Sequence, residues 1–212
     1  MRRVVILWLS SLAVLAAGAV AVCPDRRCII GHFDRAGLGL AHALRSGSLD
    51  AMMQGVTWLG SLMLLLPLTV VAALLLWRGR RRREAGFLVL AVLGSSALSH
   101  VFKLWVARPR PDLFPTWLDM PGDWSFPSAH AMQATAAALA WVLVTRQARA
   151  FWAILLGLAA VLVGLSRIYL QVHFPSDVVA GILAAVLWVA GLNALLLQPA
   201  AGGHRKSGEG AA

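Results

Sequence analysis

Charged residues are scarce in this chain of 212 residues: they make up 13% of it, against 59% for hydrophobic residues. A typical soluble domain carries about 25% charged residues, so the composition excludes an ordinary soluble fold. The strict alternation of apolar and polar residues that marks the strands of a membrane barrel is also absent. No internal repeat or heptad seam divides the sequence, which favours one membrane domain over a repeat array.

Cysteine is nearly as scarce, since only Cys23 and Cys28 are present. Two possible ligands are too few for a structural zinc site. The pair either forms a local disulfide in an oxidising compartment or remains as two thiols, and the sequence leaves both alternatives open.

Long apolar runs dominate what is present. Six of them are long enough, at about 17 to 25 residues, to cross the hydrocarbon core of a bilayer. Backbone groups in lipid must be satisfied within their own segment, so each run predicts a helix. The fold class predicted is an all-α integral membrane bundle of six transmembrane helices, forming one domain over residues 1–198. The predicted spans are 4–22, 52–77, 85–107, 129–145, 150–170 and 178–197.

Three features of the sequence modify the predicted arrangement of six spans. The first span, with Arg2 and Arg3 before its apolar run, also resembles a cleavable signal peptide, but its length favours retention. The segment between the first two spans predicts a short amphipathic outer helix lying on the membrane surface. Pro67 predicts a kink in the second span, and the Gly- and Ala-rich residues 199–212 predict a disordered cytoplasmic tail.

The net charge of +10 is unevenly distributed. If the N-terminus is cytoplasmic, the inner side receives eleven basic residues and two glutamates, and the outer side eight basic residues and seven aspartates. This distribution follows the positive-inside rule and argues against a nucleic-acid partner. The cluster Arg78 to Arg83 is expected to anchor this topology, with contact to anionic lipid as the alternative.

Three polar clusters fall at the outer ends of different predicted spans. The first, "KLWVARPRP", contains Lys103, Arg108 and Arg110. The second, "FPSAH", contains Ser128 and His130. The third, "SRIYLQVHFPSD", contributes Ser166, Arg167, His173 and Asp177. Hydropathy alone does not require that polar clusters gather on one face, so their coincidence predicts a functional site.

The residue types in these clusters suit a phosphoryl group. Lys103, Arg110 and Arg167 supply positive charge, and guanidinium groups match phosphate oxygens. Amides at the start of the fourth span add the positive end of a helix dipole. One histidine can attack phosphorus while the other protonates the leaving oxygen, and Asp177 is within reach of His173 to orient it. Because the cations neutralise the phosphate, no metal ion or other cofactor is expected.

The spacing of these residues resembles the type 2 phosphatidic acid phosphatase family of membrane lipid phosphatases. Lys103, Arg110 and Pro111 match its Lys-x₆-Arg-Pro motif. Residues 127–130 match Pro-Ser-Gly-His, with Ala129 in place of glycine. Ser166, Arg167, His173 and Asp177 match its Ser-Arg-x₅-His-x₃-Asp motif. Ala129 keeps the backbone N–H of the usual glycine, so the phosphate pocket is expected to survive with slightly less room.

The resemblance implies roles for seven residues. His173 is the nucleophile, Asp177 its partner and His130 the general acid. Lys103, Arg110, Ser128 and Arg167 hold the phosphate. Arg108 lies outside the motif, and a structural role or a contact with a lipid headgroup is expected for it.

The resulting hypothesis is a metal-independent phosphatase of the bacterial inner membrane, with its site on the periplasmic or extracellular side. Undecaprenyl pyrophosphate is the favoured substrate, and phosphatidylglycerol phosphate, phosphatidic acid and lipid A phosphates are the other candidates. Two alternatives stay open: a lipid phosphotransferase using the same phosphohistidine, and a nonenzymatic lipid-binding or transport protein. Oligomeric state is not indicated by the sequence.

Overall fold

The computed structural model describes residues 2–114 and 120–197, with side chains from residue 3 onward. The predicted tail, residues 199–212, lies outside the described residues. The described part of the chain is all-helical and contains no strand. Its elements are α1 (Arg2–Val22), η1 (Pro24–Arg26), α2 (His32–Ala43), α3 (Gly47–Trp58), α4 (Leu62–Arg78), α5 (Arg82–Val106), α6 (Ala129–Val144), α7 (Arg149–Tyr169) and α8 (Pro175–Leu196).

Helices occur in all six predicted spans, but the number that cross a membrane stays a prediction. Within the described residues, α1, α5, α7 and α8 are long and apolar enough to do so, and a bent pair formed by α3 and α4 makes a fifth candidate. The apolar helix α6 has 16 residues, which is slightly short for a bilayer core of about 30 Å.

The second predicted span, 52–77, is wrong as a continuous helix. The chain breaks after α3, and α3 and α4 are bent by 40° relative to each other. Ser61 caps the new helix, because its hydroxyl accepts a hydrogen bond from the Met63 amide at 3.2 Å. Pro67 lies inside α4, which continues through it. Apolarity alone could not reveal this break, since the residues on both sides are hydrophobic.

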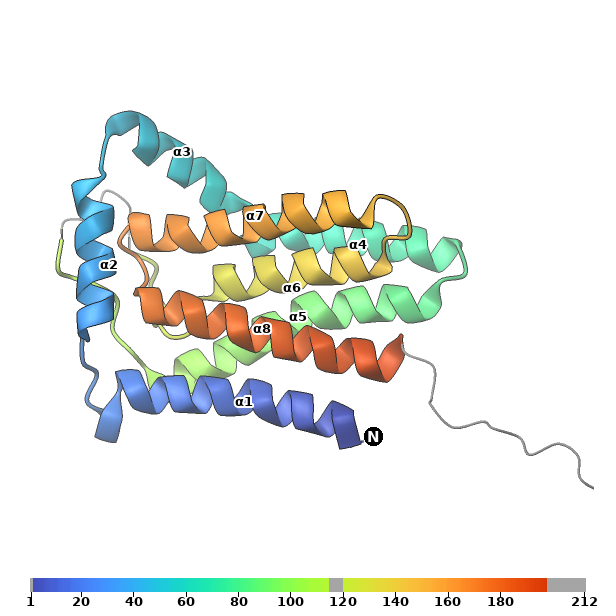
Figure 1. The fold of residues 1–212 in the computed structure, drawn as a ribbon, viewed down its shortest axis with the longest axis horizontal. Helices are drawn as coiled ribbons and strands as arrows, with labels where there is room; N and C mark the ends of the chain where they lie inside the picture. Colours follow the sequence, from blue (N-terminus) through green and yellow to red (C-terminus); the bar gives the residue numbers. More distant parts are fainter. Residues whose placement is uncertain (1, 115–119, 198–212) are drawn as a thin grey trace, which may run out of the picture.

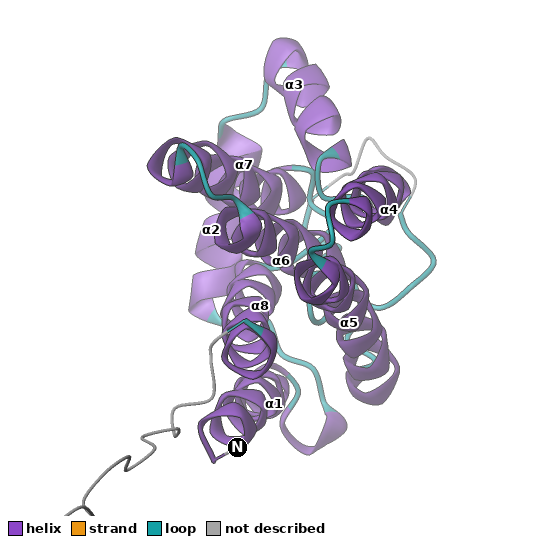
Figure 2. Cartoon of the chain, turned by 90° about the vertical axis from the view of Figure 1, so that its right-hand side faces the viewer, coloured by secondary structure: helices purple, strands orange, loops and turns teal. Residues whose placement is uncertain are grey.

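The long helices form a bundle, and α6 lies near its centre. Figure 2 looks along the bundle and shows α4, α5, α7 and α8 around α6, with α1 beside α8. Buried alanines on α6 let its neighbours approach closely. Many large apolar side chains on the outer faces of α1, α4 and α7 are exposed, as expected for helices that face lipid.

One end of the bundle is crossed by α2. Figure 1 shows α2 lying across the end where α1, α5 and α7 finish and α6 and α8 begin. Asp34 and Leu38 are buried toward the bundle, whereas Phe33 and Leu40 are exposed. A disulfide joins Cys23 to Cys28 just before this helix, which resolves the alternative that the sequence left open. That α2 lies in the membrane surface stays a prediction.

Candidate active site

The three polar clusters lie together at the end of the bundle that α2 crosses. Lys103 is in the last turn of α5 and Arg167 in the last turn of α7. Ser128 directly precedes α6, and the connection from α7 to α8 carries His173. These segments meet because α5 and α7 run toward this end while α6 and α8 run away from it (Figure 1).

The imidazole of His173 is held from both sides. Its exposed fraction is 1%. Its Nδ1 lies 3.5 Å from Oδ2 of Asp177 and 3.4 Å from the Ser125 hydroxyl, while its Nε2 lies 3.3 Å from Nη1 of Arg110. A guanidinium can only donate, so Nε2 carries the lone pair and the proton is on Nδ1, toward the carboxylate. Burial and then the charge of Arg110 lower the pKa of His173 well below its usual value, so the ring is neutral.

The carboxylate of Asp177 is fully buried and fully occupied. Oδ1 accepts from Arg108 at 2.6 Å, and Oδ2 accepts from the Ser125 hydroxyl at 2.5 Å and from the Phe174 amide at 3.0 Å. The backbone carbonyl of Asp177 also accepts from the Ser128 amide at 3.1 Å. Asp177 therefore fixes the start of α8 to the start of α6 and to the loop that precedes α6.

Arg108, which lies outside the motif, is the buried centre of this network. It forms ion pairs with Asp177 and with Asp34 of α2 at 2.6 and 2.7 Å. Its guanidinium carbon lies over the Phe174 ring, 3.9 Å from the ring centroid. Asp34 also accepts hydrogen bonds from the amide and hydroxyl of Ser176. The structural role expected for Arg108 is therefore the one found, because the side chain is only 1% exposed and out of reach of a lipid headgroup.

Sequence reasoning missed Asp34 and Ser125. Asp34 is 74 residues away from Arg108 along the chain, and no local spacing pairs them. Ser125 directly precedes the second cluster, and only its position next to "FPSAH" could have singled it out.

Lys103 and Arg110 are both paired with Asp123, in the loop before α6. Oδ2 of Asp123 lies 3.0 Å from Nζ of Lys103, and Oδ1 accepts from Nη2 of Arg110. Burial raises the pKa of Asp123, but the charge of Lys103 and the hydrogen bonds from both cations outweigh it and lower the pKa to about 2. Asp123 is therefore ionised at neutral pH. Its side chain is 46% exposed.

Two polar atoms at the site are buried and have no hydrogen-bond partner among the described residues. They are the Ser128 hydroxyl and Nε of Arg167. Ser128 is the N-cap residue of α6, but its hydroxyl accepts no capping hydrogen bond. Nη1 of Arg167 donates to the Thr57 hydroxyl at 2.7 Å. Buried polar groups are normally satisfied, so these two atoms are candidate hydrogen-bonding groups for a polar ligand. His130 follows in the first turn of α6 and is partly exposed.

An apolar groove begins beside these residues and runs along the bundle. It has a volume of about 660 Å³ and lies between α4, α6 and α7. Its lining includes Ala134, one turn after His130, and Val163, one turn before Arg167. A chain bound in this groove would therefore end next to the polar site.

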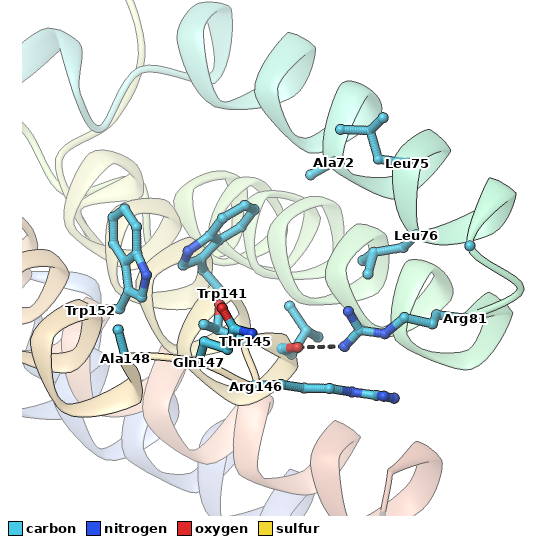
Figure 3. Close-up of a pocket in the computed structure, with 12 residues that line it drawn as sticks. Ala72, Leu75, Leu76, Arg81, Trp141, Thr145, Arg146, Gln147, Ala148 and Trp152 are labelled. Carbon is cyan, nitrogen blue, oxygen red and sulfur yellow. Dashed lines mark hydrogen bonds between the residues drawn. The ribbon is translucent and has the colours of Figure 1, made fainter.

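A second hollow lies at the opposite end of the bundle (Figure 3). Arg81 and Arg146 line it together with the rings of Trp141 and Trp152. Arg81 donates to the Val144 carbonyl at 2.5 Å, which ties the start of α5 to the end of α6.

Among the described residues, no group of three or more His, Cys, Asp or Glu side chains is placed to share a metal ion.

Comparison with known proteins decides the family. The family model of the PAP2 superfamily matches residues 84–198, which is more than half of the chain. The chain belongs to the PAP2 superfamily. The resemblance inferred from the three motifs is thereby confirmed, and with it the assignment of the chain to the phosphatases.

Relatives and a solved structure of the superfamily extend the match. Phosphatidylglycerophosphatase B of Bacillus subtilis (strain 168) is 38% identical over 146 residues, covering 65% of this chain and 70% of that protein. Undecaprenyl-diphosphatase of Sulfolobus acidocaldarius is 38% identical over 128 residues, covering 58% and 60%. The crystal structure of a transmembrane PAP2 type phosphatidylglycerolphosphate phosphatase from Bacillus subtilis matches with a TM-score of 0.74 and 31% identity, covering 92% of this chain and 96% of that one. This PAP2 chain is accordingly a multi-span membrane protein.

Proposed function

We propose that this chain removes phosphate from a membrane lipid phosphate or diphosphate, without a metal ion, through a phosphohistidine at His173. The observation that carries the proposal is the setting of His173. Its ring is buried and neutral, Nδ1 faces the Asp177 carboxylate, and Nε2 faces Arg110. A neutral imidazole whose Nε2 lone pair faces a cation suits attack on a phosphoryl group that the same cation binds.

The phosphoryl group is bound by four side chains in this proposal. Lys103, Arg110 and Arg167 supply charge, and the unpartnered Ser128 hydroxyl and Arg167 Nε supply hydrogen bonds that the protein leaves unmade. The amides at the start of α6 add donors and the positive end of the helix dipole. Three cations neutralise the charge of the transferring group, so the mechanism assigns no step to a metal.

In the first step Nε2 of His173 attacks phosphorus, an N–P bond forms and the bond from phosphorus to the lipid oxygen breaks. His130 donates a proton to the leaving oxygen. Asp177 holds the Nδ1 proton and stabilises the positive ring that results. A water molecule then attacks phosphorus and gives a proton to His130, the N–P bond breaks, and inorganic phosphate leaves.

The apolar groove between α4, α6 and α7 supports a lipid substrate. In the proposal the apolar tail of the lipid lies in this groove, and the lipid's phosphate reaches the site at the end of the groove. The names of the relatives, a phosphatidylglycerophosphatase and an undecaprenyl-diphosphatase, support the same substrate class. We favour undecaprenyl pyrophosphate over a phosphatidylglycerol phosphate or phosphatidic acid type lipid, at the extracytoplasmic face of a bacterial inner membrane.

A phosphate-release panel tests this function. Purified protein in detergent micelles with EDTA is given undecaprenyl pyrophosphate, phosphatidylglycerol phosphate, phosphatidic acid and lipid A. We expect release from at least one of them, and none from His173→Ala. His32→Ala, a change of an exposed histidine at the start of α2, should behave as the unmodified protein. Activity that disappears on chelation would contradict the metal-free mechanism, and activity retained by His173→Ala would contradict the nucleophile.

A further inference from the structure

The carboxylate of Asp123 lies where the site should receive its phosphate. Its two oxygens engage Lys103 and Arg110, one each. The same two cations are the ones assigned to phosphate in the proposed function. An anion of the chain itself thus holds two of the cations that the substrate needs.

The geometry allows this anion to leave without disturbing the cations. Backbone carbonyls bind both of them independently: that of Trp124 accepts from Lys103, and those of Asp123 and Val172 accept from Arg110 at 2.9 and 2.6 Å. These bonds remain if the Asp123 side chain alone rotates outward. Because that side chain is 46% exposed, its carboxylate would move into water and regain hydration.

We propose that Asp123 is a displaceable internal ligand, which the phosphate of the substrate replaces on Lys103 and Arg110 and which replaces the product phosphate in turn. The proposal rests on the proposed function, since it concerns the same phosphate site. The exchange is balanced in contacts, because two phosphate oxygens take the positions of the two carboxylate oxygens. The pairing of Asp123 with the two cations weakens phosphate binding by the free energy of that pairing. It therefore hastens the release of inorganic phosphate.

The contrasting possibility is that Asp123 stays in place and orients the two cations for phosphate. The two arrangements predict opposite effects of removing the charge. If the carboxylate competes, Asp123→Asn frees the cations and phosphate binds more tightly. If the carboxylate orients, the same change loosens the cations and phosphate binds more weakly.

Inorganic phosphate is the probe, measured by isothermal titration and as an inhibitor of lipid hydrolysis. We expect Asp123→Asn to lower both the Kd and the inhibition constant, by about threefold to tenfold, as suits a partly exposed ion pair. KM for the lipid should fall with them. Asp112→Asn, which removes the same charge from an exposed position of the same loop, should leave all three constants unchanged.

The outcomes separate this inference from the proposed function. If the unmodified protein releases phosphate from none of the lipids, the proposed function fails, yet the titration still decides whether Asp123 competes with phosphate. A Kd for phosphate that is unchanged or raised in Asp123→Asn overturns the inference, whether or not lipid is hydrolysed. An equal decrease in Asp112→Asn would attribute the effect to general surface charge and overturn it as well.

Discussion

At the scale of single residues, some polar groups of the site have all their hydrogen-bond and ion-pair partners within the protein, and others do not. Arg108 lies between two carboxylates, and Asp177 is saturated with donors. By contrast, the Ser128 hydroxyl and Nε of Arg167 are left without partners among the described residues. The saturated half holds the geometry of His173, and the unsaturated half is the part that we assign to the substrate.

Removing the Asp34 carboxylate tests the saturated half. In Asp34→Asn the amide oxygen can still accept from Ser176, but Arg108 loses one of its two buried charges. A charge-assisted hydrogen bond contributes about 1.5 to 3 kcal/mol, so we expect kcat to fall roughly tenfold to a hundredfold.

The pH profile distinguishes positioning from a general loss of structure. If Asp34 acts through Arg108 and Asp177 on His173, the apparent pKa in the profile of kcat/KM should move while KM changes little. Asp25→Asn, at an exposed outer position, serves as the control. A uniform loss of active protein, with an unmoved profile, would show that Asp34 only supports the fold.

His130 gives a second prediction at this scale, since general acid catalysis matters most when the leaving group is poor. His130→Ala should reduce hydrolysis of an alkyl lipid phosphate by about 10² to 10⁴, the usual range for such a group. An activated aryl phosphate, which leaves without a proton, should be affected much less. Equal losses with both substrates would argue against the acid role.

At the scale of elements, the break between α3 and α4 lets these two helices pack against α6 and α7 near the site. Gly60 lies in this break, and a Cβ there would stand 2.5 Å from Cγ1 of Val163 and 2.9 Å from the carbonyl oxygen of His130. Thr57 of α3 meanwhile receives a hydrogen bond from Arg167. The break therefore brings one helix pair against both α6 and α7 next to the proposed phosphate site.

Two glycine substitutions test this close approach. Gly60→Ala should destabilise the protein by about 1 to 3 kcal/mol, the cost of overpacking, and lower kcat because His130 must shift. Gly55→Ala on α3 meets nothing within 4 Å and should stabilise the helix by about 0.5 to 1 kcal/mol. Thermal unfolding in detergent and phosphate release measure both effects. If the two variants behave alike, the close contact at Gly60 does not matter.

The same elements show what the sequence could and could not predict. Helices in the apolar runs and the gathering of motif residues at one bundle end follow from hydropathy and local spacing. The break at Gly60 does not follow from hydropathy, because the residues on both sides are apolar, and the closeness of Val163 to Gly60 is a tertiary contact. The pairing of Asp34 with Arg108 and the pairing of Asp123 with Lys103 also depend on tertiary contacts, which hydropathy does not encode.

At the scale of the whole molecule, the two ends of the bundle differ in charge. The end that holds the site carries Arg residues paired with Asp34, Asp123 and Asp177. The opposite end carries the basic turn from Arg78 to Arg83 and further arginines after α6, with Glu84 as the acidic partner. The positive-inside rule then predicts that the site faces away from the cytoplasm.

Cysteine labelling in intact cells tests this orientation. Met120→Cys, at the site end, and Gln147→Cys, in the exposed turn after α6 at the other end, are each made in a background with Cys23→Ser and Cys28→Ser. A membrane-impermeant thiol reagent should label position 120 in intact cells and position 147 only after lysis. Each variant is the control for the other, because both positions are exposed to solvent and differ in the bundle end at which they lie. The reverse pattern would place the proposed phosphate site on the cytoplasmic side and exclude substrates that are confined to the outer leaflet.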